Sequence, residues 1–310
     1  MICTIVIIAG IYTSRNLVHR VETFLLYMAN TTYIENRSNK MQTLMLNQLK
    51  WWNKEFDLSN EFFSLFLDGT MTWSGAYFER DGMDLEEAQL AKYERLCRQL
   101  HLLPTDHVLE IGCGWGANAI YMAKNYGCRV TSLTISEQQH QLACRRVKEE
   151  GLEQQVTILL QDYQKLRGKF DKIVSIEMLE AAGPPYLNTW FRKCHELLKQ
   201  DGLLALQVIT CPDSRDDSLL PSLASINAAI RRTGEMTLVD VMEMGFHYAA
   251  TLKVWFMQFN SRLAEVRDLG FDEHFIREWN YYLRHYETAF RLQNIHAMQL
   301  VYARPDSTSH

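Results

Sequence analysis

The chain has 310 residues and a formal net charge of −5, which argues against a nucleic-acid partner bound through its phosphates. Its seven cysteines are scattered without a C-x-x-C pair, so they indicate neither a zinc site nor a disulfide framework. We therefore expect no metal, and a reducing, cytoplasmic compartment. A chain of this length buries roughly 75% of its unfolded surface, which suits one large domain or two small ones.

The first 45 residues are expected to form a helical extension that touches a membrane surface. The apolar run over residues 2–12 is too short to span a bilayer, and it lacks the basic residues that precede the core of a signal peptide. Such a run adds affinity for a membrane interface. The remainder is expected to form one domain over residues 46–305, followed by a tail over 306–310.

Strands and helices alternate through most of this domain. The first helix is expected to begin after Asp84, because Asp84 and Glu87 have the spacing of a capping box and apolar residues follow at helical spacing. The alternation beyond it predicts an α/β fold with a doubly wound, mostly parallel sheet covered on both faces. The expected strands are 107–112, 129–135, 156–162, 171–178 and 203–210, and the helices between them are 116–126, 136–150 and 186–199.

Two further strands are expected at 236–244 and 297–304, on either side of a helical region over residues 251–291. Aromatic residues recur in this region at helical spacing, as on a buried helix face, and some of them could line a tunnel. We expect the segments 211–235 and 251–292 to be insertions that form a helical lid.

The most informative stretch is 110–116, E-I-G-C-G-W-G, which joins an expected strand to an expected helix. Gly112, Gly114 and Gly116 let the turn pass close to a ligand, because no Cβ blocks the approach. The spacing G-x-G-x-G differs from the pyrophosphate-binding G-x-G-x-x-G. With Glu110 two positions ahead, it favours a ligand that has an amino group and no phosphates, and S-adenosylmethionine fits that description. The alternative is an ordinary glycine-rich turn.

Candidate cofactor contacts also follow the next two strands. Thr134, Ile135 and Gln139 lie where a dinucleotide site places an acidic residue on the ribose hydroxyls. Thr134 and Gln139 are neutral hydrogen-bonding groups suited to the same role. After the third strand, Asp162 could accept a hydrogen bond from an adenine amino group, and Tyr163 could stack on the ring.

Two carboxylates, Glu177 and Glu180, lie three residues apart at the end of the fourth strand, in the crevice where α/β enzymes bind ligands. A carboxylate there costs desolvation free energy unless it is paired or has a chemical role. On this pattern alone a catalytic role and a structural role both stay open. The fifth strand supplies Gln207 and Ile209, and a later loop supplies Tyr248.

These residues lie in motifs that resemble the cyclopropane-fatty-acyl-phospholipid synthase family, which also includes mycolic-acid methyltransferases and plant alkaloid N-methyltransferases. The resemblance runs from about residue 56 to residue 305, nearly the whole chain after the extension. It implies a seven-stranded S-adenosylmethionine-dependent methyltransferase fold with one added antiparallel strand. It rests on the segments 71–80, 112–116, 133–139, 176–183, 245–252 and 295–301.

The resemblance also implies a reaction. The double bond of a phospholipid acyl chain attacks the sulfonium methyl group, and the resulting carbocation loses a proton and closes to a cyclopropane. A bound bicarbonate takes that proton, held by a cysteine, a glutamate, a histidine, an isoleucine and a tyrosine. Negative charge at this place fits the chemistry, because an apolar pocket alone would raise the free energy of the cation.

Mapped onto this chain, the glutamate is Glu180, the isoleucine is Ile209 and the tyrosine is Tyr248. Gly75 stands where the cysteine is usual, and it can still donate its backbone N–H. Gln207 stands where the histidine is usual, and it can hydrogen-bond but cannot carry a positive charge.

Near the cofactor, Trp73 replaces an expected tyrosine, and Ser74 and Trp115 complete the implied contacts. A segment that helps to wall the acyl channel in relatives is missing between Asp213 and Leu220. Three functions therefore stay open: methyl transfer to phospholipid acyl chains at a membrane surface, giving a cyclopropane or a methyl branch; methyl transfer to an amine or another small nucleophile; and non-catalytic binding of lipid or cofactor.

Overall fold

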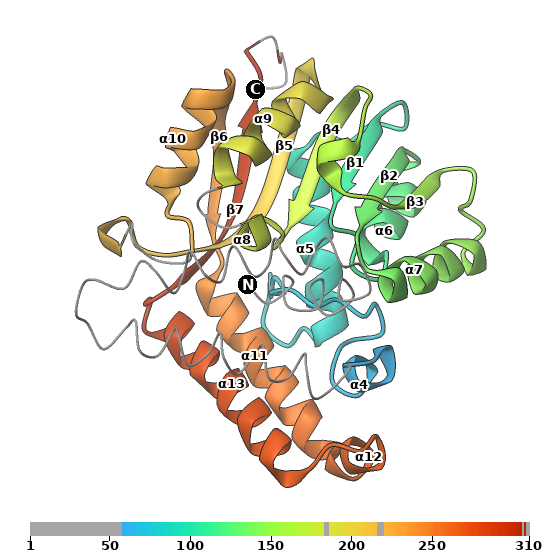
Figure 1. Cartoon of the computed structure of the whole chain (residues 1–310), viewed down its shortest axis with the longest axis vertical. Coiled ribbons are helices and arrows are strands. Elements are labelled where there is room, and N and C mark those ends of the chain that lie inside the picture. The colour runs from blue at the N-terminus through green and yellow to red at the C-terminus, as the bar shows by residue number, and fades with distance from the viewer. Residues whose placement is uncertain (1–57, 183–185, 216–219, 306, 308–310) are drawn as a thin grey trace.

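The core of the molecule is a seven-stranded sheet with the strand order β3-β2-β1-β4-β5-β7-β6 (Figure 1). Strands β1 to β5 pair in parallel, whereas β7 runs antiparallel to both β5 and β6. This confirms the predicted doubly wound α/β class. The strands are β1 (His107–Ile111), β2 (Arg129–Thr134), β3 (Val156–Leu160), β4 (Phe170–Ile176), β5 (Leu198–Thr210), β6 (Thr237–Glu243) and β7 (His296–Ala303). The computed structural model describes residues 58–182, 186–215, 220–305 and 307.

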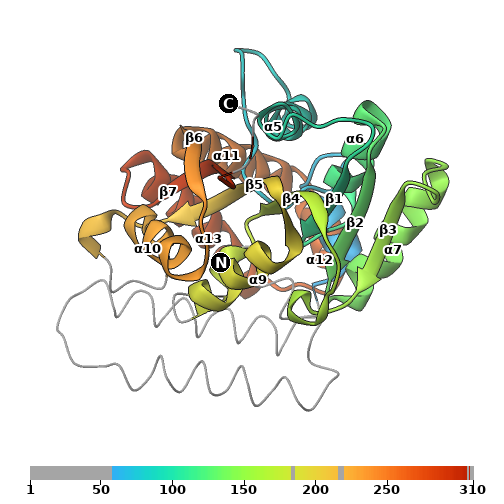
Figure 2. The ribbon, with the colours of Figure 1, turned by 90° about the horizontal axis from the view of Figure 1, so that it is seen from above.

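Helices cover both faces of this sheet (Figure 2). On one face, α5 (Leu85–Gln99), α6 (Ala117–Tyr126) and α7 (Glu137–Glu149) share an apolar cluster with β1 to β3. On the other, α9 (Leu187–Leu197) and α10 (Leu223–Thr233) pack over β4 and β5. Asp84 begins α5 with the expected capping box, and Ser136 caps α7 by accepting a hydrogen bond from the Gln139 N–H.

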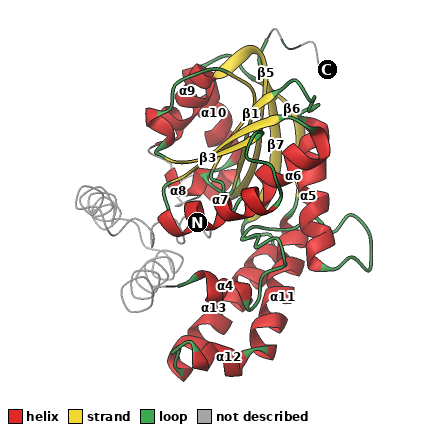
Figure 3. Ribbon diagram, turned by 90° about the vertical axis from the view of Figure 1, so that its right-hand side faces the viewer, coloured by secondary structure: helices red, strands yellow, loops and turns green. Residues whose placement is uncertain are grey.

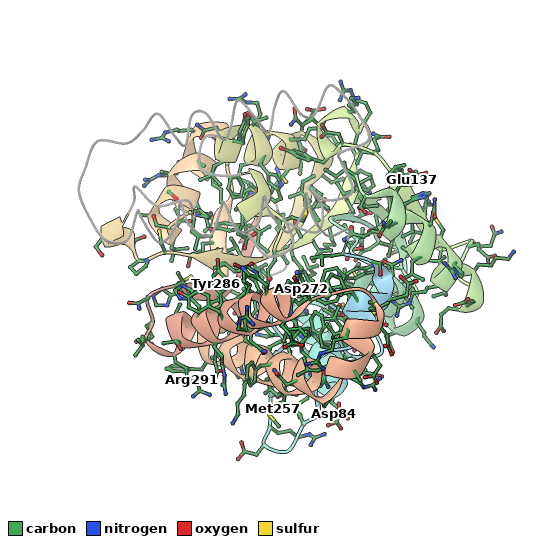
Figure 4. All side chains as sticks on the ribbon, turned by 60° about the horizontal axis from the view of Figure 1, so that its bottom comes forward. Asp84, Glu137, Met257, Asp272, Tyr286 and Arg291 are labelled. Atoms are coloured by element: carbon green, nitrogen blue, oxygen red, sulfur yellow. The ribbon has the colours of Figure 1, made fainter. Side chains whose placement is uncertain are left out.

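A second group of helices forms a separate layer beyond one end of the sheet (Figures 1 and 3). It contains α4 (Asn60–Ser64), α11 (Gly245–Ser261), α12 (Leu263–Asp268) and α13 (Glu273–Arg291). Their aromatic core includes Trp115, which follows β1, and Ile209, near the end of β5. The layer therefore lies against the carboxyl ends of the parallel strands. Figure 4 labels Asp272, the N-cap of α13, and Arg291 at its end.

The structure around Tyr248 differs from what the sequence predicts. Helix α11 begins at Gly245, six residues before the expected start, because the Gly245 N–H is capped by Glu243 Oε1 at 2.9 Å. Tyr248 therefore lies in the first turn of a helix, with its N–H donating to the Met244 carbonyl, and the expectation of a loop there is wrong. In the segment 211–235, α10 packs against α9, so this part of the expected lid covers the sheet.

The expected membrane-touching extension over residues 1–45 lies outside the described residues. So do residues 216–219, which fall where the resemblance predicts that a segment of the relatives is missing. Within the described ranges, none of the helices combines the length and the apolar character that crossing a bilayer requires.

Candidate active site

A cavity lies at the carboxyl ends of β1 and β4. The turns that follow these two strands and the start of α6 form most of its wall, and the segment 71–74 completes it. The cavity is lined by seven of the residues that were predicted to contact the cofactor. They are Trp73, Ser74, Glu110, Gly112, Gly114, Trp115 and Gln139.

The glycine turn has the conformation that its sequence suggests. Gly112 has φ of 96°, and a Cβ there would lie only 2.1 Å from Cγ of Met178, which follows β4. Gly114, with φ of 49°, has nothing within 4 Å of the position a Cβ would take. Gly116 caps α6 with φ of 87°. Gly112 thus lets the two turns approach each other, and Gly114 leaves open space beside the cavity.

Glu110 is the acidic group of this cavity. It is buried, and its carboxylate accepts hydrogen bonds from the Ser132 hydroxyl and, at 2.8 Å, from the Asn118 amide. Burial raises the pKa of Glu110 to about 7, and the two hydrogen bonds oppose that rise. The amide oxygen of Asn118 is buried and has no hydrogen-bond partner among the described residues.

These groups fit S-adenosylmethionine. The Glu110 carboxylate and the unpartnered Asn118 oxygen can accept hydrogen bonds from an amino group. The N–H of Gly114 makes no backbone hydrogen bond within the described part of the chain, so it is available to a carboxylate. Residues of the turn would hold the amino-acid end of the cofactor by these contacts.

The affinity for S-adenosylhomocysteine is expected to rise about tenfold between about pH 6 and about pH 8. Glu110 with a pKa of about 7 is mostly neutral at the lower pH and mostly ionised at the higher, and only the ionised form attracts the ligand's ammonium group. Isothermal titration measures this change. Glu110→Gln should flatten the profile, whereas Glu150→Gln, which removes a surface carboxylate paired with Lys124, should keep it. A flat wild-type profile would contradict the assignment.

The predicted ribose contacts lie side by side after β2. Thr134 Oγ1 donates to Gln139 Oε1 at 2.9 Å, and it accepts a hydrogen bond from the Ser136 N–H. Gln139 lines the cavity, whereas Thr134 and Ile135 do not. The Gln139 amide is therefore held in place by the strand end that precedes it.

The two predicted adenine contacts follow β3. Asp162 caps a short 3-10 turn, Tyr163–Lys165, by accepting a hydrogen bond from the Gln164 N–H at 2.9 Å. Neither Asp162 nor Tyr163 lines the cavity. Their part in binding adenine stays a prediction.

Aromatic and polar groups of the segment 71–74 close the cavity. The Trp73 ring stacks on Trp255 of α11 with centroids 4.5 Å apart. The Ser74 hydroxyl accepts a hydrogen bond at 2.6 Å from the ammonium group of Lys92, a fully buried lysine of α5. The segment is thereby anchored to the helical layer on one side and to α5 on the other.

A second polar cluster lies directly beyond this segment, around Glu177. Its carboxylate is fully buried, and it accepts hydrogen bonds from the Gly75 N–H at 2.9 Å and from the Gln207 amide at 2.9 Å. The Tyr248 hydroxyl donates to its second oxygen at 2.8 Å. The family resemblance assigns Gly75, Gln207 and Tyr248 to one site, and all three contact the carboxylate of Glu177, to which the resemblance gives no role.

Glu180 and Ile209 form the neighbouring pair. The Ile209 N–H donates to Oε1 of Glu180, and Oε2 is buried without a hydrogen-bond partner among the described residues. Burial raises the pKa of Glu180 to about 7, and the charge of Glu177 adds to the rise. The structure therefore divides the five predicted catalytic residues into three that contact Glu177 and two that contact each other.

The sequence did indicate that Glu177 lies in the site, because Glu177 and Glu180 form a pair of carboxylates at the end of the fourth strand. Its partners come from residues 75, 207 and 248, which are far apart in the chain. Gln207 also contacts Gln299, which accepts a hydrogen bond from Arg95. Helical or strand periodicity gave no reason to select these two residues.

A mostly parallel sheet with an antiparallel β7, together with a glycine-walled cavity at β1, defines an S-adenosylmethionine-dependent methyltransferase. The family model described as Mycolic acid cyclopropane synthetase matches residues 46–300. The chain belongs to this family.

Individual relatives agree with this assignment. The chain is 37% identical over 263 residues to Cyclopropane-fatty-acyl-phospholipid synthase of Escherichia coli (strain K12), a match that covers 81% of this chain and 67% of that protein. It is also 37% identical to Tuberculostearic acid methyltransferase UfaA1 of Mycobacterium tuberculosis, covering 76% of this chain and 60% of that protein. Mycolic acid cyclopropane synthase CmaA1, solved in complex with SAH and CTAB, superimposes with a TM-score of 0.75 at 30% identity, over 80% of this chain and 95% of CmaA1.

Proposed function

We propose that this enzyme transfers a methyl group from S-adenosylmethionine to the double bond of an unsaturated acyl chain of a phospholipid. The observation that carries the proposal is a buried acidic cluster directly beside the cofactor cavity. Trp73 and Ser74 line the cavity, and the next residue, Gly75, donates to Glu177. Relatives named for fatty-acyl phospholipids and mycolic acids support an acyl chain as the acceptor.

The bound cofactor supplies an electrophilic methyl group, and the chain's own residues supply the rest of the chemistry. Methylation of a double bond leaves a positive charge on carbon. Glu177 and Glu180 are both buried carboxylates, and negative charge held there would stabilise the cation as it develops. Loss of a proton to a group in this cluster then closes the cyclopropane ring or gives a methyl-branched alkene.

The aromatic helical layer suits an acyl substrate. Tyr248 stacks on Phe290 of α13 at 4.4 Å, and Trp73 stacks on Trp255. Rings of this kind present apolar surface to a hydrocarbon chain and a negative face to a cation. We place the reaction at a membrane surface, with the enzyme bound peripherally, because phospholipid acyl chains are found there.

The test is the lipid extract of cells that express the chain, examined by mass spectrometry. Phospholipid acyl chains should gain the mass of one methylene unit, and a methyl-labelled cofactor should place its label in those chains. Folded protein that binds S-adenosylhomocysteine without modifying any acyl chain would refute the proposal. Activity on an amine panel in that case would establish N-methylation instead.

A further inference from the structure

The carboxylate of Glu177 accepts hydrogen bonds from the groups that, by the family resemblance, would hold bicarbonate. Gly75 and Gln207 stand at the positions of the cysteine and the histidine, and Tyr248 is the tyrosine. Their N–H, amide and hydroxyl groups all point at the two oxygens of Glu177, at 2.8–2.9 Å. Bicarbonate and a side-chain carboxylate present the same planar pair of oxygens, so the same donors suit either one.

The backbone delivers this carboxylate in an unusual conformation. Glu177 has φ of 52°, in the left-handed region that residues other than glycine rarely adopt. Its N–H donates to the Gln207 carbonyl at 2.7 Å, which continues the pairing of β4 with β5 by one residue. The side chain is thus turned inward and held by its three donors.

A chain of hydrogen bonds runs from Arg95 through Gln299 and Gln207 to Glu177, and we call it the polar relay. It determines which end of the Gln207 amide faces Glu177. Arg95 can only donate, and it donates to Gln299 Oε1 at 2.8 Å, while Gln299 Nε2 donates to Gln207 Oε1 at 3.0 Å. The oxygen of Gln207 is therefore engaged, and its NH₂ group must face Glu177 and the Gly75 carbonyl. The relay therefore presents an N–H donor to the Glu177 carboxylate, and its other members, one arginine and two glutamines, cannot accept a proton at neutral pH.

The glycine at position 75 belongs to the same arrangement. A Cβ there would lie 2.8 Å from Cγ of Tyr248, so the ring packs directly against the backbone of Gly75. A cysteine at this position would push the ring away from Glu177. Glycine at position 75 and glutamine at position 207, in place of the usual cysteine and histidine, are therefore both explained if they hold the carboxylate of Glu177.

We infer that Glu177 replaces bicarbonate as the proton acceptor of this enzyme. The inference deepens the proposed function and depends on it. After methyl transfer, a C–H bond next to the cationic carbon breaks, and its electron pair forms the new carbon–carbon bond. The proton goes to Oε2 of Glu177, which accepts one hydrogen bond from Tyr248 and has capacity for another. The neutral acid returns the proton to water after the product leaves.

Two substitutions of Glu177 test this role. Glu177→Gln keeps the shape and removes the base, and it should lower the rate of acyl methylation by about 100-fold or more. Glu177→Gly suits the left-handed backbone and vacates the space of the carboxylate. It should be equally slow in buffer freed of carbon dioxide, and bicarbonate or formate should restore part of its activity. The wild-type rate should be the same with and without bicarbonate.

Glu94→Gln is the matched control. Glu94 lies on α5, where its carboxylate accepts hydrogen bonds from the hydroxyls of Tyr121 and Tyr126, at 2.8 and 3.0 Å. The substitution also removes a carboxylate held by tyrosine, but outside the active site, and it should leave the rate unchanged. A wild-type rate that falls on removal of bicarbonate and recovers on its addition would overturn the inference, as would full activity of Glu177→Gln.

A binding measurement decides the inference even if no lipid is methylated. Carbon-13 NMR should detect saturable binding of labelled bicarbonate to Glu177→Gly and none to the wild-type protein. S-adenosylhomocysteine should bind both proteins equally, which shows that the variant is folded. Bicarbonate binding to the wild-type protein that is lost in Tyr248→Phe would refute the replacement. Absence of acyl methylation in every variant and buffer would refute the proposed function instead.

Discussion

Substitution of Glu180 by glutamine is expected to lower the rate of acyl methylation by about 100-fold while leaving the affinity for S-adenosylhomocysteine unchanged. Glu180 accepts the Ile209 N–H with one oxygen, and its other oxygen has no partner among the described residues. At about pH 8, above its pKa of about 7, its charge would stabilise a cation on the substrate. Methylation of a neutral amine develops no carbocation and should suffer less, so the ratio of the two losses identifies the acceptor.

The same substitution should change how stability depends on pH. The pKa of Glu180 is about 7 in the folded protein and 4.5 in its ordinary state, so between these values the folded form binds the proton that the unfolded form has lost. Glu180 therefore destabilises the fold as pH rises from about 5 to about 8, by roughly 3 kcal/mol at most. Between the two pH values, the free energy of unfolding should fall less for Glu180→Gln than for the wild-type protein, as measured by denaturant unfolding. An equal fall in both proteins would show that Glu180 is not the group responsible.

The fold was largely predictable because its signals are local. The glycines at 112, 114 and 116 lie between an apolar run and an amphipathic one, and each adopts the positive φ that glycine permits. Asp84 and Glu87 form the expected capping box. Each of these features depends on residues within a few positions of one another, so periodicity and spacing were sufficient to locate them.

The arrangement around Glu177 was not predictable in the same way. The pattern placed two carboxylates at a strand end, but which one meets Gly75 depends on a left-handed backbone at Glu177 and on the approach of α11. The early start of α11 depends on the Glu243 carboxylate, which caps Gly245. The family resemblance predicts roles for particular residues of the family's motifs, and it gives none to Glu177. The contacts of Glu177 depend on residues that only the fold brings together.

Gln207→Leu is expected to lower the free energy of unfolding by about 3–5 kcal/mol. Gln207 is 1% exposed and its side chain makes three hydrogen bonds, so its removal leaves the Gly75 carbonyl, Glu177 Oε1 and the Gln299 amide each short of a partner. Two of these groups are neutral, but Glu177 is a buried carboxylate, and the loss of a donor to a charged group costs the most. Leucine fills a similar volume and restores none of these hydrogen bonds.

Chemical denaturation of the purified variant measures this loss. Gln141→Leu is the control, because Gln141 is exposed on α7, and its replacement should change the free energy of unfolding by less than about 0.5 kcal/mol. Gln207→Glu separates lost hydrogen bonds from charge: it places a second carboxylate against Glu177, and at about pH 8 it should destabilise the fold more than Gln207→Leu does. If Gln207→Leu unfolds at the wild-type denaturant concentration, the relay from Arg95 to Glu177 contributes nothing to stability, and the orientation of Glu177 must come from Tyr248 and the backbone alone.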